Sequence, residues 1–206
     1  MPLPFGFVPS CLPTKAPRPP TGGAWLHEIK HDGFRVIARK DGDRVRLYSR
    51  PGNDLGYRFS LIVAALARLR SRSGIIDGEA VCCDDHGVPS FDRIRYRRYD
   101  DRVFLYAFDL IELDGHDLRR ETFETRKATL ASVLAKAAPG LRLNEHIEAD
   151  ARPCSPRPAT WASKASCRSA RALPTQRPLG RSPDWIKSKN PACEAVKREA
   201  EEDWGR

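Results

Sequence analysis

A lysine lies within a short run, WLHEIKHDGFR, over residues 25–35. In an extended segment, side chains alternate between the two faces, so we expect Glu28, Lys30 and Asp32 to share one face. A lysine amine is a nucleophile when it is neutral, which burial or a nearby cation favours. The same pattern also fits a strand with a surface row of Glu-Lys-Asp ion pairs. The run by itself leaves both interpretations open.

The residues that follow this lysine suit a bound phosphate or ribose. Gly33 allows the backbone to bend or to approach a ligand closely. Arg35 adds a forked cation that matches phosphate and ribose oxygens.

Four later segments place charged or aromatic side chains on or beside predicted strands. Taken alone, the first segment fits a Pro-Gly turn with an exposed arginine, and the second fits an acid at a strand end. The third fits a core phenylalanine, and the fourth fits a solvated strand face with two lysines. Their central residues are, in chain order, Arg50, Glu79, Phe108 and the pair Lys187 and Lys189.

The string HEIKHDGFR resembles the K-x-D-G-x-R motif of the covalent nucleotidyltransferases, which are ATP-dependent DNA ligases, RNA ligases and capping enzymes. It is most similar to the adenylation domain of bacterial ligases of the ligase D type. The resemblance covers roughly residues 1–150 and 181–206, with the segments SRPG, DGE, YAFDLIELDG and WIKSK in the family's order. It implies that Lys30 takes AMP from ATP as a phosphoramidate.

The resemblance also implies how the other residues contact the nucleotide. Phe108 matches the aromatic residue that stacks on adenine, and Lys187 and Lys189 match lysines that reach the ATP phosphates. Glu79 matches a glutamate near the ribose or a metal-bound water, and it is a candidate ligand for Mg or Mn. The predicted nucleotide-binding residues are Glu28, Arg35, Arg50, Glu79, Phe108, Lys187 and Lys189.

The fold implied by the resemblance is an α+β nucleotidyltransferase (ATP-grasp-like) domain of two packed antiparallel sheets with flanking helices. Local patterns agree with it. Alternating apolar residues predict strands over 34–40, 44–49, 74–81 and 103–113. Apolar residues at helical spacing predict helices over residues 59–69 and 123–134. We expect one adenylation domain over residues 1–206, divided into an extended arm (1–22), a nucleotide-binding core (23–150), an anomalous segment (151–180) and the last nucleotide-binding motif with a tail (181–206).

Composition narrows the classes of protein further. The chain has 206 residues, no apolar run long enough to span a membrane and no signal-peptide pattern at its start. Its six cysteines form no C-x-x-C pair, which argues against a zinc site and favours free thiols. The formal net charge is +9, but six of those charges come from residues 151–180. Arginines and tyrosines over residues 93–102 fit either a DNA contact or a solvated surface.

Residues 151–180 do not match the rest of the chain. They contain five prolines and no isoleucine, valine, phenylalanine or acidic residue, so we expect poor order and an unpaired neighbouring strand edge. The family carries here an E-G-I-V-x-K-R motif with a metal-binding glutamate. Residues 160–170, TWASKASCRSA, give MGFEGIVSKR in another reading frame if suitable synonymous third bases are chosen. We therefore hypothesise a local frameshift, an incomplete metal site and slow or absent formation of lysyl-AMP.

The resemblance predicts a DNA ligase (ATP) that joins strands in repair, with nicked or broken DNA as its partner. The chain ends just after the last nucleotide-binding motif, so we expect an OB-fold or end-joining partner to be supplied separately. The expected location is the bacterial cytoplasm at the nucleoid, with no membrane. Two alternatives stay open: a non-catalytic remnant that binds nucleotide or DNA, and a nucleotidyltransferase acting on RNA ends.

Overall fold

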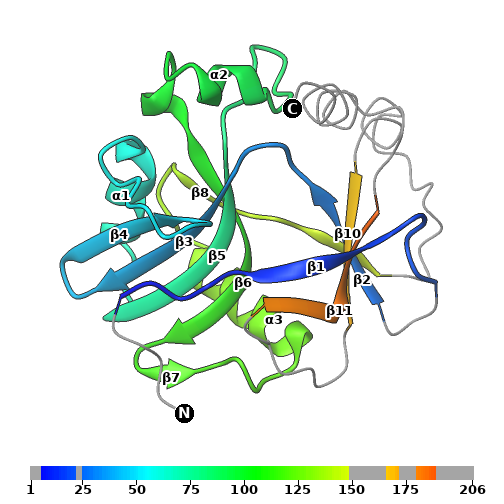
Figure 1. Ribbon diagram of the computed structural model, residues 1–206. Coiled ribbons are helices and arrows are strands. Elements are labelled where there is room, and N and C mark those ends of the chain that lie inside the picture. Colours follow the sequence, from blue (N-terminus) through cyan, green and yellow to red (C-terminus); the bar gives the residue numbers. More distant parts are fainter. Residues whose placement is uncertain (1–5, 22–24, 149–165, 172–179, 189–206) are drawn as a thin grey trace.

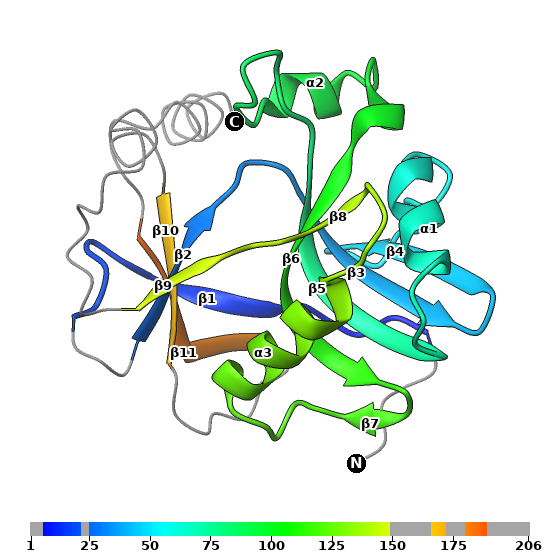
Figure 2. The same ribbon diagram turned by 180° about the vertical axis from the view of Figure 1, so that it is seen from behind.

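Two β-sheets form the frame of the molecule (Figures 1 and 2). The computed structural model describes residues 6–21, 25–148, 166–171 and 180–188. The five-stranded sheet has the order β1-β11-β10-β2-β9. Its strands are β1 (Cys11–Ala16), β2 (Trp25–Lys30), β9 (His146–Glu148), β10 (Ser166–Arg171) and β11 (Gly180–Ser188).

The six-stranded sheet contains the path β4-β3-β5-β6-β7, and β8 pairs with β6 beside that path. Its strands are β3 (Phe34–Asp41), β4 (Arg44–Ser49), β5 (Ser73–Val81), β6 (Phe104–Leu113), β7 (His116–Asp117) and β8 (Leu141–Leu143). Most strand pairs are antiparallel, while β1 with β11 and β6 with β8 run parallel. The predicted α+β fold of two sheets is confirmed, with one parallel pair in each sheet.

Helices cover one face of the six-stranded sheet. They are α1 (Ser60–Ala67), α2 (Phe91–Arg95), the short 3-10 helix η1 (Asp100–Arg102) and α3 (Phe123–Leu134). The Thr122 side chain caps α3 by accepting a hydrogen bond from the Thr125 amide, which satisfies a free donor of the first turn. Both predicted helices are confirmed. None of the helices in the described residues has the length and apolar character needed to cross a bilayer.

The main core lies between this face and the helices. Strand alternation directs Val36 and Ala38 into it, while Arg35 and Ile37 point to the opposite face. The buried members of the core come from β3, β4, β5, β6, β8 and all three α-helices, and include Val36, Leu47, Ile62, Leu66, Ile76, Ile94, Leu105, Leu110, Leu130 and Leu141.

A smaller apolar cluster lies at the seam between the two sheets. It joins Cys11, Leu26 and Trp185 of the five-stranded sheet to Phe108 of β6 and Phe123 of α3. Phe108 is an extra residue in β6, because Gly78 pairs with Ala107 and Asp77 pairs with Asp109. This bulge changes the phase of the strand, so Phe108 faces the five-stranded sheet while Leu105 and Leu110 stay in the main core.

The extended arm and the anomalous segment each contribute a strand to the five-stranded sheet. The arm contributes a sheet strand, since β1 pairs with β11. Residues 166–171 of the anomalous segment form β10, which pairs with both β2 and β11. The expected lack of a core strand and the unpaired edge are therefore wrong for these six residues. Pairing with a neighbour on each side places this strand inside the five-stranded sheet. Residues 151–165 and 172–179 lie outside the described residues.

Candidate functional site

The predicted nucleophile is the last residue of β2, where the chain leaves the five-stranded sheet for β3 in the six-stranded sheet. Residues 31–33 make this crossing, so Asp32 lies beyond the strand and does not share its alternation with Glu28 and Lys30. The expectation that Asp32 shares a face with Glu28 and Lys30 is therefore wrong. A Cβ atom on Gly33 would lie 2.1 Å from the Ala80 carbonyl oxygen. The crossing segment therefore requires glycine at this position because the backbone of β5 is so close.

Arg35 is fixed by a buried carboxylate one strand away. Its Nε lies 2.6 Å from Asp77 Oδ1 and its Nη2 lies 2.8 Å from Asp77 Oδ2. Nη2 also donates to the Cys11 carbonyl oxygen at 3.2 Å, which links β3 to β1. Burial alone would lower the pKa of the guanidinium, but the neighbouring Asp77 carboxylate outweighs burial and raises this pKa. Arg35 is therefore a fixed cation.

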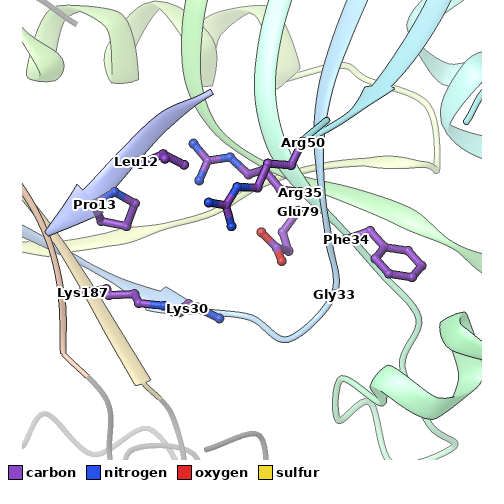
Figure 3. Close-up of a pocket in the computed structure, with 9 residues that line it drawn as sticks. All are labelled: Leu12, Pro13, Lys30, Gly33, Phe34, Arg35, Arg50, Glu79 and Lys187. Atoms are coloured by element: carbon purple, nitrogen blue, oxygen red, sulfur yellow. The ribbon is translucent and has the colours of Figure 1, made fainter. Parts of the chain in front are cut away.

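A pocket of about 320 Å³ lies between the two sheets at this crossing (Figure 3). Lys30 and Lys187 reach it from the five-stranded sheet, while Arg35 and Glu79 reach it from the six-stranded sheet. Arg50 enters from the turn after β4. Its lining consists of Leu12, Pro13, Lys30, Gly33, Phe34, Arg35, Arg50, Glu79 and Lys187.

The pocket lining carries four cationic side chains, Lys30, Arg35, Arg50 and Lys187, and one carboxylate, Glu79. The Lys30 Nζ donates to the His31 carbonyl oxygen at 3.5 Å, so the amine lies close to the crossing segment. A concave site with this excess of positive charge suits a polyphosphate. Five of the predicted site residues thus meet in one pocket although they are far apart in the sequence.

Two other predicted residues, Glu28 and Phe108, are not among the residues that line this pocket. Glu28 is 3% exposed and forms a buried ion pair with Lys127 of α3. Phe108 is 1% exposed, and the Arg35 guanidinium carbon lies 4.6 Å from its ring centroid. Lys189 lies outside the described residues. The structure therefore places Glu28 and Phe108 behind the pocket wall.

The pocket lining offers a divalent metal one carboxylate ligand, Glu79. Mg²⁺ is commonly held by one or two carboxylates together with substrate phosphates, so Glu79 fits a contributing ligand. Among the described residues, no group of three or more histidine, cysteine, aspartate or glutamate side chains could hold a metal without the substrate.

Several residues around the site were missed by sequence reasoning. Asp77 lies two residues before Glu79 in the DGE string, and the alternation of a strand could have placed both carboxylates on one face. Leu12 and Pro13 line the pocket from a strand that the sequence suggested was only an arm. Lys127 and Asn144 carried no local signal, since their partners are distant in the sequence.

The arginine-tyrosine segment after β5 lies partly on the surface. Arg93 pairs with Asp85 and lies over Tyr99, whereas the four consecutive residues 95–98 are exposed. A DNA contact here stays a prediction. Of the cysteines whose side chains the structure describes, Cys82 and Cys83 are free thiols, as predicted.

Comparison with known proteins decides the family. A model of the ATP dependent DNA ligase domain matches residues 14–152. The chain belongs to this family. The multifunctional non-homologous end joining DNA repair protein LigD of Mycobacterium tuberculosis is 34% identical over 169 residues, which are 81% of this chain and 22% of that protein. A DNA ligase of Natronomonas pharaonis is 36% identical over 141 residues, which are 60% of this chain and 26% of that ligase.

A solved structure agrees with these relatives. A mycobacterial DNA ligase D complexed with ATP and MES superposes with a TM-score of 0.72 at 27% identity, covering 91% of this chain and 62% of that one. The predicted resemblance to an adenylation domain of the ligase D type is confirmed. The chain spans about a fifth of the length of the LigD proteins that it matches.

Proposed function

We propose that this ligase-family domain transfers AMP from ATP to Lys30 and then to a DNA 5′-phosphate. The observation that carries the proposal is the pocket in which Lys30 meets Arg35, Arg50, Glu79 and Lys187. Family membership and the ATP complex of a related ligase D support ATP as the nucleotide.

In the first step, the neutral Lys30 Nζ attacks the α-phosphorus of ATP. A P–N bond forms, the bond between the α-phosphorus and the bridging oxygen breaks, and pyrophosphate leaves with that electron pair. The amine releases a proton to solvent. Lys187 and Arg50, which line the pocket, would neutralise phosphate charge, and the ion pair with Asp77 would preorganise Arg35. A divalent metal (Mg or Mn), when bound beside Glu79, would offset further phosphate charge.

The second part of the proposal concerns DNA. The AMP group would pass from Lys30 to a 5′-phosphate at a nick or end, and attack by a 3′-hydroxyl would seal the strands and release AMP. The LigD relatives are named as non-homologous end joining DNA repair proteins, which supports this acceptor. An OB-fold or end-joining partner would close over the DNA, and the predicted place of action is the bacterial nucleoid.

The sequence around β10 affects how fast lysyl-AMP forms in this proposal. The IVSKR part of the alternate-frame string would fall on residues 166–170, which form most of β10 in the present sequence. The metal-binding glutamate of that string is absent from the present sequence. We propose that this chain forms lysyl-AMP slowly and that the alternate-frame segment speeds it by orders of magnitude.

Incubation with ATP labelled at the α-phosphorus, followed by a denaturing gel, tests these steps. Label should stay on the protein with ATP and not with GTP, and Lys30→Ala and Lys30→Arg should both abolish it, because arginine stays protonated. The chain carrying MGFEGIVSKR is the positive control. Label retained by Lys30→Ala would refute the assigned nucleophile. If the restored chain also stays unlabelled, the chain is a non-catalytic module; transfer of the label to RNA ends alone would favour the RNA alternative.

A further inference from the structure

Asn144 lies in the connection between β8 of the six-stranded sheet and β9 of the five-stranded sheet. It is 4% exposed, and its backbone N–H donates to the Ala107 carbonyl oxygen at 2.8 Å. That bond anchors Asn144 to β6. Its position is therefore set by the six-stranded sheet, although β9 belongs to the five-stranded one.

The Asn144 side chain contacts both neighbours of the nucleophile. Its Nδ2 donates to the Ile29 carbonyl oxygen at 3.2 Å, and its Oδ1 lies 3.0 Å from His31 Nε2. With Oδ1 as acceptor, the His31 ring donates through Nε2. The same ring stacks on Tyr106 of β6 with centroids 3.8 Å apart and planes 6° apart. The chain is thus held immediately before and immediately after Lys30.

We propose that Asn144 is a positioning residue for Lys30, a role that rests on the proposed function. A flexible lysine side chain reaches the same point in every molecule only if its backbone is fixed, and small displacements of a reacting atom are costly. The Lys30 amine has one hydrogen bond, at 3.5 Å, in the described residues, so the side chain contributes little to its own placement. Asn144 supplies that placement through the backbone and does not touch the substrate.

The chemistry of the asparagine amide explains why this residue type is needed. One side must donate to the Ile29 carbonyl and the other must accept from His31, which an amide does and neither a carboxylate nor a leucine can do. Asn144→Asp keeps the acceptor for His31 but sets a second acceptor against the Ile29 carbonyl oxygen. Asn144→Leu removes both bonds at similar size. Each change leaves a buried polar group of the nucleophile segment without this partner.

The test uses the chain with the restored segment and two measurements. Single-turnover labelling should slow by about 30- to 100-fold in Asn144→Leu and in Asn144→Asp, while the Kd for ATP changes by less than about threefold. Amide hydrogen exchange of a peptide covering residues 29–33 should speed up in both variants. His31→Phe, which keeps a ring against Tyr106 and loses the bond to Asn144, should lie between these variants and the parent.

Leu141→Ala is the matched control, because Leu141 is buried three residues earlier and contacts the main core instead of the nucleophile segment. It should lower stability without a selective rise in exchange at residues 29–33. The proposal is overturned if Asn144→Leu behaves as Leu141→Ala does, or if exchange rises while the labelling rate stays unchanged. Selective exchange in a chain that never labels would support the anchoring by Asn144 and refute the proposed function instead.

Discussion

The two sheets are stabilised in different ways. The six-stranded sheet buries a continuous apolar core under its helices. In the described residues, the five-stranded sheet supplies Cys11, Leu26 and Trp185 to a much smaller cluster at the seam. Several other contacts join it to the larger sheet or its helices through polar groups, among them Lys127 with Glu28, Asn144 with the Ile29 carbonyl, and Arg35 with the Cys11 carbonyl.

This difference shows how the nucleophile strand is oriented. Apolar burial is favourable but non-directional, so it brings surfaces together without fixing their register. Buried hydrogen bonds and ion pairs depend on distance and angle, and they are costly when broken. The strand that carries Lys30 has one residue, Leu26, in the apolar cluster, and contacts of the second kind hold it at Glu28 and Ile29. We infer that the larger sheet provides stability and that the polar links provide geometry.

Two buried ion pairs on consecutive residues of α3 provide the test of this comparison with the largest expected effect. Arg126 pairs with Asp109 of β6, and Lys127 pairs with Glu28 of β2 and donates to the Phe108 carbonyl oxygen. Removing one partner of a buried pair costs about 3–5 kcal/mol. Lys127→Met and Arg126→Met should therefore both lower the free energy of unfolding by about that amount, measured with urea.

The two variants should differ in function. Lys127→Met breaks a link to the nucleophile strand, so its labelling rate per folded molecule should fall much further than that of Arg126→Met. The folded fraction is obtained from the same urea curves. Equal losses of labelling in the two variants would mean that α3 acts on the site only through overall stability, and the distinction between the sheets would fail.

The crossing segment between the sheets gives the next test. A Cβ at Gly33 meets the Ala80 carbonyl oxygen, so Gly33→Ala must displace the segment that follows Lys30. We expect labelling to fall by about 100-fold, as for other misplacements near 1 Å. Gly74→Ala is the control, because its Cβ would make only an ordinary contact, 3.7 Å from the Glu112 carbonyl oxygen. Parent-like labelling by Gly33→Ala would show that Lys30 tolerates a displaced crossing.

Much of the larger sheet could be predicted from the sequence because its signals are local. Alternating apolar residues predict β3, β4, β5 and β6 to within one residue at most ends. The charged residues of the pocket could be predicted too, since each lies in a short string that resembles a family motif, whereas Leu12 and Pro13 could not. Lys30, in HEIKHDGFR at the end of β2, and Glu79, in DGE within β5, are examples.

The rest depends on contacts between distant segments. Lys127 lies 99 residues from Glu28, and Asn144 lies 115 residues from Ile29, so neither link leaves a local pattern. The bulge in β6 that sets Phe108 and Leu110 on different faces depends on how β6 pairs with β5. Strand β10 was missed for a related reason: its composition argues against a core element, but hydrogen bonds to β2 and β11 decide its conformation.

The smallest effect concerns a histidine on the nucleophile strand. Burial lowers the pKa of His27 in β2 below its ordinary value of 6.5. As the pH falls through about 6.5, the unfolded chain therefore binds a proton more readily than the folded one, and stability falls with it. The loss stops once the pH is below the pKa of the folded state. Because the ring is partly exposed, solvent screening keeps the effect small.

His27→Gln should remove this part of the pH dependence and so flatten the change in urea midpoint between about pH 7.5 and about pH 5.5. His86→Gln is the control, since His86 is exposed in the turn after β5 of the larger sheet. It should leave the pH dependence of the parent's urea midpoint unchanged.

The comparison of the sheets makes a further prediction. Lowering the pH should first loosen the five-stranded sheet, so amide hydrogen exchange at residues 25–30 should rise before exchange in β5. Simultaneous loss of both sheets would show that the proton acts on the whole domain at once.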